Sequence, residues 1–355
     1  MIHRTSARTL EPLPPGTLDP LAPRLQRYAF CAALLLWAAV PSPVRGDEFS
    51  GFGPLPVRNF QPIQLIFLNL PFERARVLQP GEFTLYLESV ESNEIATNQG
   101  TIDAVLKFET NRTVLGGSLS PARNLELGLG VPFISRFGGF LDPFINGIED
   151  VSQTSNPERH LFPDNTFGDF SVRRGDVPLF QGRKQQFELG DVWASAKYEA
   201  WHAPGLPIVA VRGAFKAPTG RASGVFGSGK PDFGLGVAAE YQFLDWLIVY
   251  GNLNLIYPVG PVTPGHLTLN PMLTEGVAGE ARLWRQLSFV LQQETYTSPF
   301  HGTDARLLDG TVVELTLGLN FVWNPFLFQL AAVDNISPVV SAADFSVFFR
   351  TTYQR

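Results

Sequence analysis

From about residue 81 to the C-terminal end, short segments of alternating apolar and polar residues follow one another along the chain. The segment Thr311–Phe321 is representative, because apolar side chains recur at its odd positions whereas Glu314, Thr316, Gly318 and Asn320 lie between them. A period of two predicts a β-strand with two unlike faces. The polar face of such a strand meets water or a polar lumen.

The same alternation recurs often enough to predict twelve strands. We place them at Phe83–Ser92, Ile102–Ser118, Asn124–Phe133, Phe187–Ala200, Ile208–Lys216, Asp232–Phe243, Leu247–Tyr257, Pro271–Trp284, Leu287–Thr297, Thr311–Phe321, Phe326–Val333 and Phe345–Tyr353. No segment between these strands has the pattern of a helix.

The connections between the predicted strands differ in length in a regular way. Short ones at 120–123, 201–207, 244–246, 285–286 and 324–325 alternate strictly with longer ones at 93–101, 134–186, 217–231, 258–270, 298–310 and 334–344. An even number of antiparallel strands with such connections is typical of an outer-membrane barrel. The sequence therefore predicts an all-β fold, a single up-and-down antiparallel transmembrane β-barrel at 81–355 with short periplasmic turns and long extracellular loops.

One face of each predicted strand suits contact with lipid. Apolar residues occupy the odd positions of Leu125–Phe133, Phe233–Phe243 and, apart from Thr351, Phe345–Tyr353, and aromatic residues cluster at the ends of these rows. Aromatic residues at both ends of an apolar row are typical of the girdles at the two membrane interfaces.

Composition agrees with this fold and narrows the function. The chain has 29 Phe, 33 Gly and 29 Pro but 2 Met and 17% charged residues, which favours strands and turns over helices. A net charge of −6 with scattered basic residues excludes nucleic acid as a partner. The glycine-rich stretch Gly224–Lys230 matches most of a phosphate-binding loop, but Pro231 and a strand follow it, so we expect no cofactor. Asp142, Glu149 and Asp150 lack the spacing of a calcium loop, and we expect no metal site there.

The first 46 residues have the features of a cleavable signal peptide. The apolar run Tyr28–Val40 is too short to span a bilayer but suits the core of a secretory signal, with cleavage expected before Asp47. An uncleaved anchor is the alternative. We therefore expect export to the bacterial outer membrane, with outer-membrane lipid and the barrel-assembly machinery as partners.

Residues 47–80 do not follow the strand pattern. The stretches Gly51–Pro56 and Gln61–Leu68 are extended, apolar and interrupted by proline, which a soluble periplasmic tail would not require. We interpret this part as a segment tucked into the barrel lumen. A thirteenth strand or a periplasmic stub are the alternatives.

The inward faces of the predicted strands carry charges of both signs. They include Lys107, Glu109 and Glu294 and, as the candidate residues for the lumen or a solute, Asp191, Lys197, Glu199, Arg212, Lys216, Glu240, Glu280, Arg282 and Glu314. Two interpretations stay open: a salt-bridged lumen that keeps the barrel rigid, or a charged constriction that selects solutes.

Several short motifs resemble a bacterial family, the domain of unknown function 3187. They are Gly53-Pro54-Leu55, Arg58-Asn59, Gln61-Pro62, Leu125–Leu129, Gly138–Asp142, Gly190–Trp193, Ala196–Tyr198, Pro218–Gly220 and Gly227–Gly229 with Asp232. The last two are also similar, more weakly, to outer-membrane transporters of the phenol-degradation meta-pathway type. The resemblance implies an outer-membrane location and no established activity.

We thus expect passive passage or binding of a small solute, hydrophobic solutes included. A structural or surface-interaction barrel without transport is the alternative, and a lipid-acting enzyme is a second one. No histidine after residue 46 is predicted on a strand face beside a serine, so we expect no enzymatic activity.

Overall fold

The computed structural model describes residues 49–152, 157–262, 267–337 and 341–355. The predicted signal peptide and parts of three predicted loops therefore lie outside the described residues. Within these residues, no helix has the length and apolar content needed to cross a membrane.

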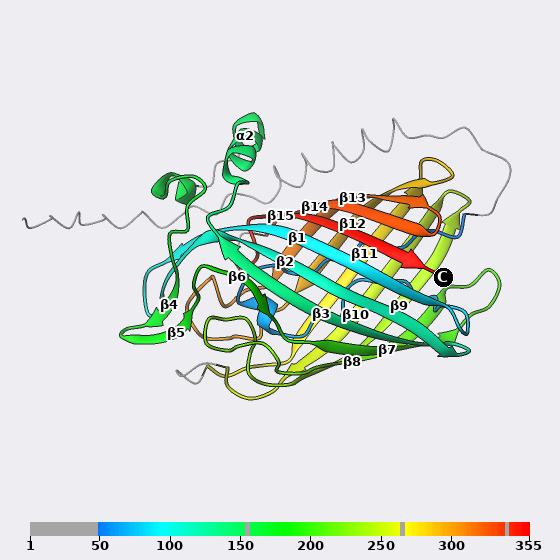
Figure 1. Ribbon diagram of the computed structural model, residues 1–355, viewed down its shortest axis with the longest axis horizontal. Coiled ribbons are helices and arrows are strands. Elements are labelled where there is room, and N and C mark those ends of the chain that lie inside the picture. The colour runs from blue at the N-terminus through cyan, green and yellow to red at the C-terminus, as the bar shows by residue number, and fades with distance from the viewer. Residues whose placement is uncertain (1–48, 153–156, 263–266, 338–340) are drawn as a thin grey trace, which may run out of the picture. The chain divides into compact units, whose positions relative to one another are not determined.

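In the described residues, fifteen strands form one antiparallel sheet, of which three are short additions at one end of the barrel. The other twelve close on themselves, because β15 pairs with both β14 and β1 (Figure 1). They are β1 (Phe83–Asn98), β2 (Asp103–Ala122), β3 (Leu125–Phe137), β7 (Trp193–Trp201), β8 (Ile208–Lys216), β9 (Asp232–Leu244), β10 (Leu247–Pro258), β11 (Met272–Arg282), β12 (Leu287–Tyr296), β13 (Val312–Trp323), β14 (Phe326–Asn335) and β15 (Phe345–Gln354). The predicted twelve-stranded barrel is confirmed.

One predicted strand is divided in the structure. The range Phe187–Ala200 consists of the end of a short strand, β6 (Gln185–Leu189), and of β7, with Asp191 between them. The carboxylate of Asp191 accepts hydrogen bonds from the backbone N–H groups of Gly220 and Ser228. These bonds to a loop replace the pairing of a continuous strand.

The long connection after β3 is structured, and the expectation that it holds no helix is wrong. It contains α2 (Asp142–Ser152), the 3-10 helix η2 (Pro157–Leu161) and the hairpin of β4 (Phe170–Arg174) and β5 (Val177–Gln181). Pro143 follows Asp142 at the helix start, where a missing N–H costs nothing. The hairpin continues the sheet, since β4 pairs with the far end of β2.

The two faces of each strand differ as the alternation predicts. In β13, Leu319 and Phe321 are exposed on the outside, whereas Glu314, Thr316 and Asn320 point inward and are buried. A membrane offers no water to an open sheet edge, so the closed ladder satisfies the backbone while the apolar rows face lipid. The chain is a transmembrane barrel.

The outward row of β13 gives a direct test of this facing. Leu317→Arg places a cation near the middle of the strand and should destabilise the folded barrel by about 2–4 kcal/mol, whereas Thr311→Arg, at the end of the same row, should cost about 0–1 kcal/mol. Urea unfolding in lipid vesicles measures both. Equal losses would show that this row does not face the hydrocarbon.

Candidate solute-binding lumen

Residues 49–82, here called the luminal segment, run along the inward-facing side chains of the barrel. Apart from the 3-10 helix η1 (Gln64–Ile66), they have no regular secondary structure, so their backbone groups need other partners. Gln292 of β12 provides two, since its side chain accepts a hydrogen bond from Leu55 N–H at 3.1 Å and donates one to Leu55 C=O at 2.9 Å. Asn320 of β13 likewise donates to the carbonyl of Gly53 at 2.8 Å.

Glu280 of β11 is fully buried beneath the start of this segment. Its carboxylate accepts hydrogen bonds from the backbone N–H groups of Phe52 and Gly53 and from the hydroxyls of Tyr250 and Ser288. Neutral hydrogen-bond donors therefore already bind the carboxylate of Glu280, which leaves few of its acceptor positions for a solute.

Lys216 of β8 fixes the middle of the luminal segment. Its ammonium donates to the carboxylate of Asp191 at 2.7 Å, the hydroxyl of Ser228 at 2.6 Å and the carbonyl of Ile66 at 2.6 Å. Asp232 lies 3.1 Å from the same nitrogen and accepts a hydrogen bond from Leu68 N–H. A single buried cation thus joins two wall carboxylates to the luminal segment.

The later part of the luminal segment is bound to the barrel wall through Glu73. Arg212 donates to Glu73 at 2.7 Å and to the carbonyl of Pro71 at 2.7 Å, while Lys197 lies 3.1 Å from the other oxygen of Glu73. Lys197 also pairs with Glu126 of β3 at 3.4 Å.

Two further arginines of the segment share one wall carboxylate. Arg74 and Arg76 pair with Glu240 of β9 at 3.1 and 2.6 Å. Glu199 of β7 accepts a hydrogen bond from the Val77 N–H at 3.4 Å. The segment therefore bonds to six of the nine candidate residues: Lys197, Glu199, Arg212, Lys216, Glu240 and Glu280.

The other three candidates are placed differently. Asp191 is linked to the segment through Lys216, and the guanidinium of Arg282 lies over the ring of Phe49 at 5.7 Å. Glu314 lies opposite Glu294 in the β12–β13 ladder, and both are buried.

The wall opposite these contacts carries a charged group that the sequence analysis did not single out. Arg112 of β2 donates to Glu88 of β1 at 2.6 Å, and Arg350 of β15 lies 3.8 Å from the same carboxylate. The guanidinium of Arg350 stacks on the ring of Tyr86, 3.7 Å from its centre. The period of two does place these four side chains inward, so the alternation could have identified them.

Arg58 of the luminal segment completes this group. It donates to the carbonyls of Gln64 and Phe67 at 2.8 and 3.0 Å. Arg58 also interacts electrostatically with Arg112 and Glu88, and with Asp232, so three cations gather near the carboxylate of Glu88.

A cavity of about 390 Å³ lies between the luminal segment and the barrel wall. It reaches residues at the short-turn end of the strands, such as Thr84, Ser118 and Gln354. Seven cationic side chains line it, Arg58, Arg74, Arg76, Arg112, Lys197, Arg212 and Arg350, against four carboxylates, Glu73, Glu82, Glu88 and Glu126. Its apolar lining includes Trp193 and Phe72.

At the long-loop end, apolar packing fills the lumen. Phe67 of the luminal segment contacts the ring of Phe300 at 5.6 Å, and Phe180 of β5 contacts the same ring at 5.8 Å. Ile63 and Leu307 belong to the same buried cluster. Among the described residues, an apolar layer thus lies between the cavity and this end.

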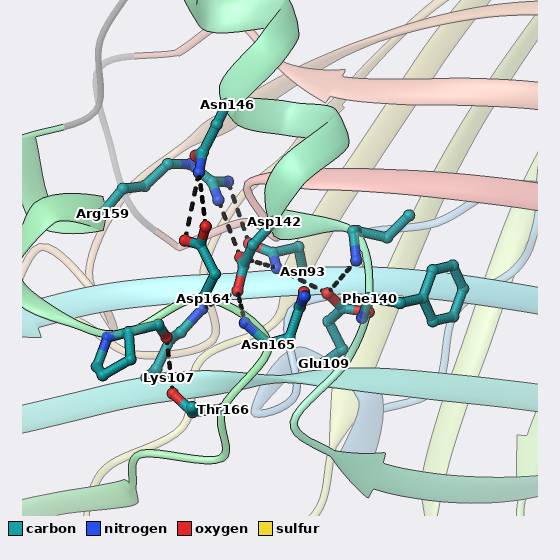
Figure 2. Close-up of polar contacts among 12 residues, drawn as sticks. Asn93, Lys107, Glu109, Phe140, Asp142, Asn146, Arg159, Asp164, Asn165 and Thr166 are labelled. Atoms are coloured by element: carbon teal, nitrogen blue, oxygen red, sulfur yellow. Dashed lines mark hydrogen bonds and ion pairs between the residues drawn. The ribbon is translucent and has the colours of Figure 1, made fainter.

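Lys107 and Glu109 are not in the lumen, contrary to the sequence interpretation. They share the outer face of β2 with the exposed Leu115, and the long connection after β3 covers them (Figure 2). Lys107 pairs with Asp142 of α2, whose other oxygen lies 3.1 Å from Arg159. Burial alone would raise the pKa of Asp142, but hydrogen bonds from Lys107, Asn165 and Asn93 outweigh it and hold the pKa below its usual value. Asp142 therefore pairs with two cations, Lys107 and Arg159.

The family described as Protein of unknown function (DUF3187) matches residues 35–354 of the chain. Among solved structures, the COG4313 outer membrane channel from Pseudomonas putida F1 has a TM-score of 0.55 at 11% identity, covering 79% of this chain and 98% of that one. The translocator domain of the autotransporter NalP from Neisseria meningitidis has a TM-score of 0.40 at 9% identity, covering 78% and 89%. The toluene transporter TodX of P. putida has 0.37 at 8%, covering 84% and 92%. No curated protein matches the chain.

Lys216 offers a test of how the luminal segment is bound. Lys216→Met removes the cation that two buried carboxylates share and should lower the free energy of unfolding by about 3–5 kcal/mol. Lys230→Met, at an exposed lysine in the neighbouring loop, should change it little. Urea titration in vesicles compares the two, and similar values would show that the Lys216 cluster does not stabilise the fold.

Proposed function

The chain belongs to the DUF3187 family, and we propose that it is an outer-membrane channel that binds and passes a small organic anion. The observation that carries this proposal is the charged cavity between the luminal segment and the wall. Its volume of about 390 Å³ is in the range of small-molecule sites. The barrel fold shared with the COG4313 outer membrane channel supports a channel.

The charges of the lining favour an anion. Seven cations line the cavity against four carboxylates, and Glu240, outside the lining, pairs with two of them, Arg74 and Arg76. The surplus lies at Arg112 and Arg350, which share the carboxylate of Glu88, and at the nearby Arg58. An anion that enters gains attraction to the surplus cations in surroundings where water screens them weakly. The apolar part of the lining, with Trp193 and Phe72, can receive the hydrocarbon portion of such a solute. We therefore propose that the solute has a hydrocarbon part and a carboxylate or similar anionic head group.

Passage requires the luminal segment to move. In the described residues, the apolar layer around Phe67 and Phe300 lies between the cavity and the long-loop end, so a bound solute exchanges through the short-turn end. Displacing the segment would open a path along the inward faces of the strands. Partial displacement of the segment costs less free energy than complete displacement, because the contacts of Glu280 and Lys216 need not break together.

Export precedes this function. We propose that residues 1–46 act as a cleavable signal peptide and that the barrel-assembly machinery inserts the barrel into the outer membrane. The lipid-facing rows and the closed ladder support an outer-membrane location.

The charge preference can be tested with two solutes of equal hydrocarbon chain. Protein in lipid nanodiscs should bind hexanoate but not hexylammonium, and planar bilayers should show a higher permeability for hexanoate. Arg350→Gln should weaken hexanoate binding roughly tenfold or more, because a hydrogen bond to a charged group contributes about 1.5–3 kcal/mol. Titration calorimetry measures the affinity.

Arg183→Gln is the matched control, since Arg183 is exposed and does not line the cavity. It should bind hexanoate as the unaltered protein does. Equal binding of the anion and the cation, or equal effects of the two substitutions, would contradict the proposed anion site.

A further inference from the structure

Three large apolar side chains form an exposed stripe on the connection between β3 and β4. Phe140, Phe144 and Ile148 are 61%, 56% and 45% exposed, and their spacing of four places Phe144 and Ile148 on one face of α2. The adjacent side of the same helix is buried, with Asp142 and Ile145 against the barrel. The barrel therefore covers one side of the helix and leaves the apolar stripe exposed.

The stripe continues the lipid-facing surface. The ring of Phe144 contacts that of Phe345, with 6.0 Å between their centres. Phe345 is the first residue of the outward row of β15, and its ladder partners, Asn93 of β1 and Asp334 of β14, are polar. Phe345 thus marks the limit of the apolar band at the long-loop end of the barrel. The stripe lies beside that limit, and aromatic residues favour the membrane interface.

A buried polar network fixes the orientation of α2 (Figure 2). Asp142 at the helix start accepts from Lys107, Asn93 and Arg159. Arg159 also pairs with Glu149, about two helical turns after Asp142, and with Asp344, the residue before Phe345. The helix cannot rotate to bury its stripe without breaking these contacts.

We propose that α2 is an interfacial helix whose Phe140, Phe144 and Ile148 insert into the outer leaflet of the membrane that holds the barrel. The continuity with Phe345 supports lipid as the occupant rather than a second protein. Glu149 and Asp150 give the helix negative charge, so its attachment depends on buried apolar area and not on attraction to anionic head groups. This surface is independent of the solute proposed for the lumen.

The test places a reporter on the stripe of the full chain. Cys31→Ser removes the one native thiol, and Ile148→Cys then carries an environment-sensitive fluorophore in phosphatidylcholine vesicles. The emission should shift to the blue, and phosphatidylcholine spin-labelled near the top of its acyl chains should quench it, because interfacial helices lie about 5–10 Å into the head-group boundary. Asp150→Cys, an exposed polar position of the same helix, is the control and should behave as in water.

Equal emission and equal quenching at positions 148 and 150 would overturn the proposal. Shielding at position 148 that depends on protein concentration and not on the spin-labelled lipid would also overturn it, and would assign the stripe to a contact between copies. Phe140→Cys provides a second reporter that precedes the helix, so a folding defect at position 148 leaves the test intact.

Discussion

The structure depends on hydrogen bonds between an irregular backbone and the inner wall of the barrel. Most residues of the luminal segment between 51 and 72 are buried, and they form no strand ladder of their own. Gln292, Asn320 and Asp232 therefore act as substitutes for a neighbouring strand. A buried amide without such a partner would cost about 1–3 kcal/mol. The luminal segment can therefore be buried only because the inner faces of the strands carry polar side chains that bond to its backbone.

The same contacts determine the electrostatics of the lumen. Glu280, Glu240 and Asp232 are engaged by backbone donors or by arginine and lysine side chains, which removes them as partners for a solute. Around Glu88, in contrast, cations outnumber carboxylates. The surplus positive charge of the cavity thus follows from how the segment is held.

Much of this could be predicted from the sequence, for one physical reason. A strand that faces lipid on one side and a polar lumen on the other must alternate, and β8 (Ile208–Lys216) is located to the residue. The alternation does not tell where the membrane ends, so Lys107 and Glu109 were assigned to the lumen although they lie outside it under α2. Contacts between distant segments, such as that of Lys216 with the carbonyl of Ile66, follow from packing and leave no periodic signal.

The central claim is that the wall of the barrel protects the backbone of the luminal segment, and hydrogen exchange measures this most directly. In vesicles, peptides that cover residues 52–68 should exchange as slowly as those of β12 and β13, and Gln292→Leu should accelerate exchange near Leu55 while sparing β9. Exchange of residues 52–68 at the rate of an unfolded chain, with no response to Gln292→Leu, would contradict the account.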